Sequence, residues 1–388
     1  MTGASIVGIG RTPIYRRGTS LPATTLELAV TALRAAADDA GLAVADIDGF
    51  VYYGLQQDTA LLAQILGIPE IRFTVGLTGG GGGSAGALGV AAAAVTSGLA
   101  RHVVVLRAIQ QANRRWGAAF APSNPGSEVS AERDFYLTAG LTGPGQMFAP
   151  IARRHMHRYG TTRAHLAEVV LTHRSHAVGR PGAIRANPLT LDDYLAAPLI
   201  ADPFTRYDFC VESDLAGAVI VATDERAADL RQRPVRVAGS EHGGEGRWGQ
   251  GETWLNMPDE IFATAGHRSI ARRLYGKSGI AATDVDAAMF YDNFSSNVLL
   301  LLEDYQFCGV GEAGPFVASG AIRYGTGSLP VNTHGGQLAE GFLAGLTHVI
   351  EAAEQLRGTA THQVPEASVV LVTGGAAAIP TSGALLTR

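Results

Sequence analysis

Short apolar runs alternate with longer stretches of helical periodicity from the first residues onward. Apolar runs of about four to eight residues bounded by turn signals are typical of buried strands, and an apolar period of 3.6 predicts helices. In the first half we predict a helix over residues 26–40, ended by Gly41, and a small-residue helix over residues 85–97, ended by Gly98. The strands predicted around them are residues 5–9, 49–53, 102–106 and 218–222, the last two as buried parallel strands.

The same pattern starts again after residue 233. It predicts strands at residues 234–238, 287–291 and 368–372 and helices at about residues 263–275, 298–305 and 336–357. Two halves rich in βαβ units, which we place at residues 1–235 and 236–388, indicate a duplicated α/β fold with parallel sheets. A segment within the first half, about residues 110–203, is richer in Arg, His and Pro and lacks strand runs. We therefore predict that it is an inserted helical lid over a site.

The amino-acid composition and net charge exclude several classes of protein. The chain has 388 residues, 49 of them glycine, with 17% charged residues and a formal net charge of −5, which describes an α/β protein with a large core. No dense block of Lys and Arg is present, so a nucleic-acid partner is not expected. No signal peptide and no membrane-length apolar stretch stand out, so we expect a cytoplasmic protein. Cys210 and Cys308 lie far apart, which favours two buried small apolar residues over a disulfide or a zinc site.

Several motifs resemble those of the thiolase superfamily. Within residues 331–345, Asn332, Gly335 and Gly336 reproduce the thiolase spacing Asn-x-x-Gly-Gly. Further blocks are similar to the sterol-carrier-protein branch of that superfamily, at residues 189–194, 200–203, 207–210 and 291–294. The resemblance covers nearly the whole chain. It implies the thiolase fold, a duplicated α/β arrangement of five layers (αβαβα), and an obligate dimer built on the N-terminal half.

The same resemblance identifies missing catalytic groups. The thiolase nucleophile is a cysteine at the start of the small-residue helix, where the helix dipole stabilises a thiolate, and this position falls on Gly81 or Gly82. The second thiolase cysteine falls within residues 373–380, around Gly375, and the thiolase histidine corresponds to Phe342. Acyl transfer through a cysteinyl thioester is therefore excluded by this route. We favour a changed reaction over an inactive enzyme.

The glycine tract before the small-residue helix allows other interpretations. A Gly-x-Ser-x-Gly match centred on Ser84 resembles the nucleophile elbow of α/β-hydrolases, but neither His348 nor His362 stands out as the partner base. A phosphate-binding loop would need a Lys-Ser/Thr ending, which is absent. We favour Ser84 as the helix N-cap, with Gly83 and the glycines before it letting substrate approach the backbone.

Tyr291 stands where thiolases have an asparagine or a histidine at the oxyanion hole. A tyrosine there is similar to the thiolase-like aldolases of steroid side-chain degradation, which cleave a β-hydroxyacyl-CoA instead of thiolysing a β-ketoacyl-CoA. A phenol can accept the hydroxyl proton, but its ordinary pKa of about 10 requires nearby charge, hydrogen-bond donors or a concerted proton transfer. His334 would present its imidazole to the thioester or to Tyr291. The alternative interpretation is a structural tyrosine at a strand end with its hydroxyl satisfied.

The remaining motif residues are assigned to the substrate. Gly335 and Gly336 would let the acyl chain approach closely, and Asn332 would fix the loop. Asn293, which belongs to the same motif as the tyrosine, is assigned to substrate binding, as are Phe342 and Gly375. The resemblance implies a second tyrosine where this chain has Phe342, which leaves a slower, differently specific or inactive enzyme as open outcomes.

Other clusters of polar and aromatic residues favour structural roles. Histidine pairs without acidic neighbours are expected on solvated lid helices rather than at a metal site, and arginine pairs on solvated faces rather than at the phosphates of coenzyme A. These residues are His155, His157, His173 and His176, and Arg114, Arg115, Arg153 and Arg154. Aromatic residues that would line an acyl pocket, or else belong to core or dimer contacts, are Tyr52, Tyr53, Tyr136 and Phe148.

The leading hypothesis is a CoA-ester retro-aldolase acting on a bulky, steroid-like β-hydroxyacyl-CoA. Coenzyme A would be part of the substrate, with no covalently bound cofactor and no metal. The resemblance implies a separate partner of the DUF35 type, with an OB-fold and a zinc ribbon, bound to a homodimer of this chain as a heterotetramer. Two alternatives stay open: an acyltransferase or condensing subunit of a secondary-metabolite complex, and a noncatalytic acyl-CoA-binding scaffold.

Overall fold

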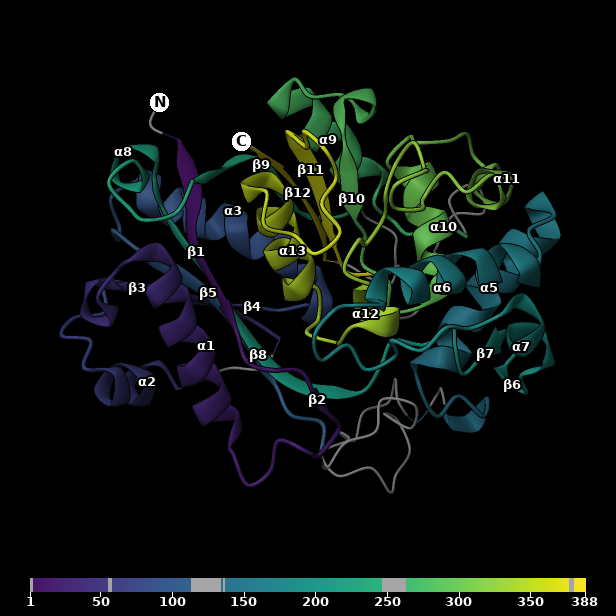
Figure 1. The fold of residues 1–388 in the computed structure, drawn as a ribbon, viewed down its shortest axis with the longest axis horizontal. Coiled ribbons are helices and arrows are strands. Elements are labelled where there is room, and N and C mark those ends of the chain that lie inside the picture. Colours follow the sequence, from purple (N-terminus) through teal and green to yellow (C-terminus); the bar gives the residue numbers. More distant parts are fainter. Residues whose placement is uncertain (1–2, 55–57, 113–133, 135–136, 246–262, 377–379) are drawn as a thin grey trace.

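A large mixed sheet forms the centre of the computed structural model (Figure 1), which describes residues 3–54, 58–112, 134, 137–245, 263–376 and 380–388. The strand order is β10-β11-β12-β9-β1-β8-β5-β3-β4, and β2 pairs with β8 beside this path. These strands are β1 (Ala4–Arg11), β2 (Tyr15–Arg16), β3 (Gly49–Tyr53), β4 (Phe73–Leu77), β5 (Val103–Ile109), β8 (Ser213–Thr223), β9 (Val235–Gly243), β10 (Ala287–Met289), β11 (Val369–Gly374) and β12 (Thr381–Thr387). A separate small sheet pairs β6 (Leu199–Ala201) with β7 (Phe204–Thr205).

The strand directions differ in part from those predicted. β3 runs parallel to β4 and β5, and β10 runs parallel to β11. The prediction of a parallel strand at residues 218–222 is wrong, because β8 runs antiparallel to both β1 and β5. The predicted parallel sheets are likewise one mixed sheet. An apolar run that is buried on both faces has the same appearance in either direction, so the sequence pattern could not separate the two cases.

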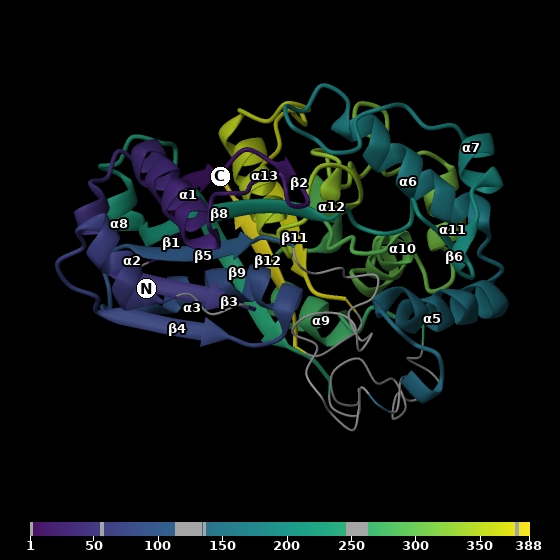
Figure 2. The same ribbon diagram turned by 90° about the horizontal axis from the view of Figure 1, so that it is seen from below.

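Helices cover the sheet in layers, as Figures 1 and 2 show from two sides. The helices of the two halves are α1 (Thr25–Ala40), α2 (Thr59–Leu66), α3 (Gly83–Thr96), α8 (Asp224–Ala227), α9 (Arg268–Ser278), α10 (Ser295–Asp304), α11 (Ala313–Ala318), α12 (Gly336–Ala339) and α13 (Leu346–Arg357). Alternate residues of one strand enter different hydrophobic clusters. In β1, Ile6 packs in the cluster of α3 and α13, while Val7 packs in the cluster of α1. In β11, Val370 joins α3 and α13, while Leu371 joins the cluster of α9 and α10.

Five layers follow from this alternation. β1 and β9 pair at only two positions, Ser5 with Arg236 and Ile6 with Val235, so the two parts of the sheet meet along a short seam. One part lies between α1 and the pair α3–α13, and the other lies between that pair and α9 with α10. The predicted αβαβα arrangement is confirmed.

Local signals set the helix ends that matter for the site. α1 begins at a capping box formed by Thr24 and Glu27. As predicted, it ends at Gly41, which the structure shows in the left-handed conformation. The single helix predicted over residues 336–357 is wrong: α12 ends at Ala339 and α13 begins at Leu346. Between them the backbone reverses at Ala344 (φ 50°) and Gly345 (φ 92°), a conformation that helical periodicity does not reveal.

The predicted lid segment is helical where the structure describes it. It contains α5 (Pro144–Tyr159), α6 (Arg163–Ala177) and α7 (Leu191–Ala196), with α6 packed against α10, α11 and α12. The prediction that the lid histidines lie on solvated faces is wrong for three of them, because the exposed fractions of His155, His173 and His176 are 2%, 0% and 3%. Arg114, Arg115 and Tyr136 lie outside the described residues. The boundaries between the halves and the lid stay a prediction.

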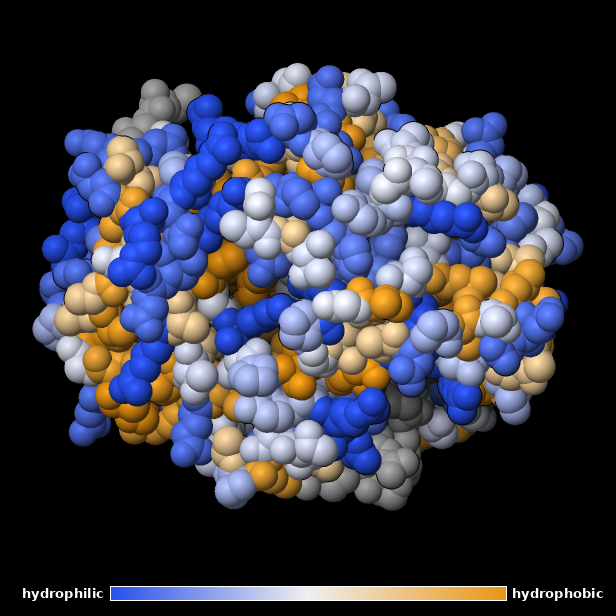
Figure 3. All heavy atoms as spheres, viewed as in Figure 1, coloured by the Kyte–Doolittle hydropathy of each residue, from blue (hydrophilic) through white to orange (hydrophobic). Residues whose placement is uncertain are grey.

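The outer surface is mixed in character. On the face shown in Figure 3, hydrophilic side chains surround and interrupt the apolar areas. Throughout the described residues, every helix is too short or too polar to cross a membrane. Arg153 of α5 is exposed, as predicted, and its Nε lies 3.7 Å from Asp202 Oδ2.

Candidate active site

The carboxyl ends of five strands bring the candidate residues together. In open α/β sheets, ligands bind beyond the carboxyl ends of parallel strands. In the N-terminal half, Tyr53 ends β3, the glycine tract follows β4, and Arg107 lies near the end of β5. In the C-terminal half, Tyr291 follows β10 and Gly375 follows β11.

The Tyr291 phenol lies directly over the glycine tract. A side chain at Gly81 would collide with the Tyr291 hydroxyl and ring, so the phenol occupies the space that a nucleophilic side chain would need. The backbone of Tyr291 is fixed on both sides: its N–H donates to Thr373 Oγ1 at 2.9 Å, and its carbonyl accepts from Asn297 Nδ2 at 2.5 Å. Tyr291 is 6% exposed. At the start of α3, the Tyr291 phenol thus fills the space that the cysteine side chain would take in a thiolase.

The two loops that carry cysteines in thiolases meet backbone to backbone. A Cβ on Gly375 would lie 2.8 Å from the Gly82 Cα, and a side chain at Gly82 would overlap the carbonyl oxygen of Pro380. His267, which is fully buried, holds this contact from behind, because its Nε2 lies 3.1 Å from the Gly375 carbonyl oxygen. Residues 377–379, which belong to the segment expected to carry the second cysteine, lie outside the described residues.

Ser84 is not the helix N-cap that we predicted. Helix α3 begins at Gly83, its N-cap is Gly82, and Ser84 lies within the first turn. The Ser84 hydroxyl donates to the Gly81 carbonyl at 3.0 Å. In the described ranges no hydrogen bond joins Ser84 to a histidine, because His348 binds the His334 ring and His362 binds the Thr333 carbonyl. The hydrolase interpretation therefore lacks its base.

A buried polar chain runs behind Tyr291. Asp292 Oδ2 lies 3.1 Å from His173 Nδ1, and Asp292 Oδ1 lies 3.1 Å from His348 Nε2. The chain continues from His348 Nδ1 to His334 Nε2 at 2.9 Å, and Glu340 Oε2 lies 4.0 Å from the same His334 nitrogen. All five side chains have no exposed surface. The sequence singled out His334 but missed Asp292, His173 and His348 in this network.

Burial and the two neighbouring histidines have opposite effects on the pKa of Asp292. Burial raises the pKa of its carboxyl, but the contacts with His173 and His348 outweigh burial and hold that pKa well below its usual range. The carboxylate also accepts the backbone N–H groups of Gln337 at 2.9 Å and Leu338 at 3.1 Å. Burial, with the neighbouring His348 and Arg180, lowers the pKa of His334 well below its usual value, so its imidazole is neutral. Asp292, which directly follows Tyr291 in the chain, thus holds the first turn of α12 in place.

The other predicted motif residues surround this network. Asn332 fixes its loop as predicted, because its Oδ1 accepts the Phe290 N–H at 2.7 Å and its Nδ2 donates to the Phe290 carbonyl at 2.9 Å. The space beside Gly335 is filled by Ala177, and the space beside Gly336 by the Asp292 carboxylate. Asn293 is partly buried, and its carbonyl accepts the Cys210 N–H at 3.0 Å. No hydrogen bond or ring contact joins His334 to Tyr291 within the described residues, and the assignment of these residues to substrate binding stays a prediction.

Several known proteins are similar to this chain in sequence. A family model described as "Thiolase C-terminal domain-like" matches residues 249–387. The "17-hydroxy-3-oxo-4-pregnene-20-carboxyl-CoA lyase" of Mycobacterium tuberculosis is 35% identical over 99% of this chain and 98% of that protein. The "Steroid side-chain-cleaving aldolase" of Thermomonospora curvata is 36% identical over 99% of this chain and 97% of its own length. The chain belongs to the thiolase-like aldolases.

A solved structure agrees with this assignment. The "Ltp2-ChsH2(DUF35) aldolase" is 34% identical and aligns with a TM-score of 0.90, covering 100% of this chain and 98% of that one. The thiolase fold and the class of carbon–carbon lyase predicted from the sequence are therefore confirmed.

In this thiolase-like aldolase, Phe342 belongs to the central core. It is 6% exposed and packs in the cluster of α3 and α13, and its backbone N–H donates to Ser213 Oγ at 2.8 Å. The candidate pocket aromatics do not form one group. Tyr53 packs in the same central cluster, Tyr52 faces α1 in the outer cluster, and Phe148 stacks on Phe294 with ring centroids 4.7 Å apart.

The two cysteines of the aldolase also differ in part from expectation. Cys210 and Cys308 are partly rather than fully buried, and burial raises the pKa of each thiol to about 12. For Cys210, the neighbouring Asp292 carboxylate adds to this rise. Both thiols are therefore protonated at neutral pH, which makes them poor nucleophiles.

We predict that His176 makes the stability of this aldolase depend on pH. Its Nδ1 lies 3.1 Å from the Val331 carbonyl oxygen and its Nε2 accepts the Tyr324 N–H at 2.9 Å, so the folded state holds a neutral ring. Burial lowers the pKa of His176 to about 3, against about 6.5 in the unfolded chain. Its contribution to the free energy of unfolding is therefore complete above pH 6.5 and is lost, at about 1.4 kcal/mol per pH unit, as the pH falls toward 3.

Urea unfolding of the parent and of His176→Asn at pH 7.5 and pH 5.5 tests this, because the difference between the two proteins isolates one histidine. We expect the parent to lose about 1 kcal/mol more than the variant between these pH values. Equal losses would contradict the prediction. His157→Asn, at an exposed position of α5, is the control for removing a histidine.

Proposed function

We propose that this chain is a retro-aldolase that cleaves a bulky, steroid-like β-hydroxyacyl-CoA, with coenzyme A present only as part of the substrate. The observation that carries the proposal is the Tyr291 phenol over Gly81, because it supplies an acid/base group where thiolases have their thiol. The names of the two relatives support the substrate class, since one is a carboxyl-CoA lyase and the other cleaves a steroid side chain.

The proposed reaction needs one proton carrier. Tyr291, as phenolate or in a concerted transfer, takes the proton of the β-hydroxyl group. The bond between the α and β carbons breaks, the β carbon becomes a ketone or aldehyde carbonyl, and the electron pair moves into the thioester enolate. The enolate then takes a proton at its α carbon, returned through Tyr291, to give the shortened acyl-CoA. Atoms and electrons balance without a metal or an oxidant.

The negative charge that develops on the enolate oxygen needs hydrogen-bond donors to stabilise it. We assign this role to backbone N–H groups of the glycine tract, at the positive end of the α3 dipole, and to His334. His334 Nε2 is engaged by His348, whereas its Nδ1 has no hydrogen-bond partner among the described residues. Nδ1 is therefore the nitrogen that we propose as donor to the enolate, in the tautomer in which His334 Nε2 accepts a hydrogen bond from His348 Nδ1.

We propose that two copies of the chain associate through β4. This strand ends the large sheet, and its side chains alternate between partly buried and exposed. An edge strand leaves backbone N–H and C=O groups available for pairing, and two copies related by a twofold axis satisfy each other. The resemblance to thiolases implies a dimer built on the N-terminal half, and this supports a second copy of the chain as the partner of β4.

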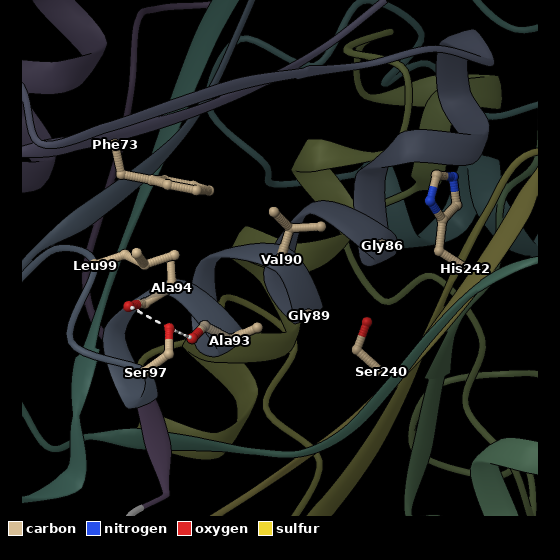
Figure 4. Close-up of a pocket in the computed structure, with 10 residues that line it drawn as sticks. All are labelled: Phe73, Gly86, Gly89, Val90, Ala93, Ala94, Ser97, Leu99, Ser240 and His242. Atoms are coloured by element: carbon tan, nitrogen blue, oxygen red, sulfur yellow. Dashed lines mark hydrogen bonds between the residues drawn. The ribbon is translucent and has the colours of Figure 1, made fainter.

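A groove of about 400 Å³ lies beside the same edge (Figure 4). Phe73 of β4 and Val90 of α3 form apolar walls, and Leu99, which is 53% exposed, lies at one end. His242 and Ser240 of β9 line the groove beside Gly86 and Gly89 of α3, where a side chain on either glycine would overlap them. A second copy of the chain that pairs with β4 would also cover this apolar groove and remove it from contact with water.

We also propose a DUF35-type partner, bound to the dimer as a heterotetramer, because the similar solved structure is named for Ltp2 together with ChsH2(DUF35). The first experiment is co-expression with a DUF35 protein, determination of the mass of the complex, and mass spectrometry of products from a branched β-hydroxyacyl-CoA. We expect a ketone and a shortened acyl-CoA in equal amounts. Binding of the substrate without any product would favour a scaffold, and transfer of the acyl group to an added acceptor would favour the acyltransferase alternative.

A further inference from the structure

Arg107 is a buried cation at the carboxyl end of β5. The side chain is 6% exposed, its Nη1 donates to the Tyr53 carbonyl at 2.6 Å, and its guanidinium lies 5.5 Å from the centroid of the Tyr53 ring. Its Nε has no hydrogen-bond partner among the described residues. A side chain at Gly54 would overlap the guanidinium, so the turn after β3 leaves space for this cation. Burying a guanidinium is costly unless nearby negative charge offsets the lost hydration.

The groups around Arg107 are phenols. Tyr53 packs against Gly83, and Tyr291 packs against Gly81, so both rings lie on the same turn at the start of α3. Both rings also contact the segment between α12 and α13. The Tyr53 hydroxyl donates to the Leu343 carbonyl at 3.3 Å, and a Cβ on Gly345 would lie 3.2 Å from the Tyr291 ring. Arg107 and Tyr53 thus form one side of the compartment that holds the Tyr291 phenol.

Burial and four neighbouring groups act on the pKa of Tyr291. Burial raises the pKa of its phenol well above the usual value, and Cys210, Tyr53 and Asp292 raise it further because each bears negative charge when ionised. Arg107 acts in the opposite direction. Burial lowers the pKa of Arg107 itself, and Tyr53 and Tyr291 oppose that change. A proton transfer that creates phenolate character on Tyr291 therefore needs a compensating charge, and Arg107 is positioned to provide it.

We propose that Arg107 is a positioning residue for the reaction, whose buried positive charge stabilises negative charge on the Tyr291 oxygen, with Tyr53 holding the guanidinium in place. This inference rests on the proposed role of Tyr291 as the proton carrier. It adds a residue that no sequence motif identified. It also gives Tyr53 a specific role, in place of the general one of lining an acyl pocket.

The test measures ionisation at position 291 directly. A fluorinated tyrosine, whose phenol is more acidic, is incorporated at position 291 in proteins with Arg107, Arg107→Lys and Arg107→Met, and its ¹⁹F NMR shift is followed against pH. We expect Arg107→Met to raise the pKa of this phenol by about one unit or more, and Arg107→Lys to stay close to the parent. Arg236→Met, an exposed arginine on β9, is the control for losing a positive charge.

The direction of the shift separates this role from a structural one. If Arg107 only filled space, Arg107→Met would loosen the compartment and admit water, and the pKa at position 291 would stay the same or fall. Either result would overturn the proposal. Because the NMR titration needs no turnover, it tests Arg107 even if the CoA-ester assay gives no product. Where turnover is found, kcat of Arg107→Met should fall about tenfold, and that of Arg107→Lys less, since one pKa unit is a factor of ten in phenolate.

Discussion

Tyr291→Phe is expected to lower kcat by about 10²-fold or more and to leave the fold and substrate binding in place. The substitution removes the Tyr291 hydroxyl that lies over Gly81 and keeps the aromatic ring that packs there. The backbone of residue 291 is held by Thr373 and Asn297 through main-chain atoms, so these contacts do not depend on the hydroxyl. A loss in kcat with an unchanged KM would therefore report the missing acid/base group.

The measurement is steady-state cleavage of the CoA ester by the complex, with substrate binding followed separately by calorimetry. Tyr159→Phe, at the end of α5, is the matched control, because it removes a phenol hydroxyl outside the compartment. Unchanged turnover in Tyr291→Phe would reject the proton-carrier role and return Tyr291 to the structural interpretation.

Gly81→Ala is expected to cost nearly as much activity as loss of the phenol itself. One added methyl group at position 81 collides with the Tyr291 hydroxyl, so the ring must move away from the start of α3. Displacement of a catalytic group by about 1 Å can lower the rate about 10²-fold, and we expect an effect of this order on kcat. The backbone of Gly81 is not in the left-handed region, so alanine brings no conformational strain there.

A double-mutant cycle shows whether the two substitutions act through the same atom. If they do, Gly81→Ala should lower kcat of Tyr291→Phe by much less than it lowers kcat of the parent. Independent, additive losses would show that residue 81 affects the reaction in another way. Gly276→Ala on α9 is the control, since a methyl group there meets no other atom within 4 Å and should leave kcat unchanged.

Motifs predicted the parts of this molecule that depend on nearest neighbours in the sequence. The glycine tract, the loop around Asn332 and the helix ending at Gly41 were located correctly, because each uses a local conformation that few residues accept. The break between α12 and α13 was missed because the apolar period continues across it, and only Gly345 marks the reversal. The direction of β8 was missed because burial on both faces removes the alternation that distinguishes strand environments.

The residues that tune the site could not be predicted from their sequence positions. His173 follows a polar helical pattern and was expected in solvent, yet tertiary packing of α6 brings it to Asp292. Arg107 lies near the end of an apolar strand, where a charged residue normally marks the surface, and only the pairing of β5 with β3 shows that it is buried beside Tyr53. Both cases depend on contacts between segments more than 50 residues apart, for which one sequence gives no signal.

The packing of the glycine tract also bears on how this chain can evolve. The thiolase nucleophile corresponds to Gly81 or Gly82, and at these glycines the Tyr291 phenol and the Pro380 carbonyl occupy the space of a side chain; beside Gly375 that space is taken by Gly82. A cysteine introduced alone at either position would therefore overlap atoms of the present site. Laboratory evolution toward thiolysis would therefore have to start from variants at position 291, so that the phenol leaves before or together with the introduction of a thiol.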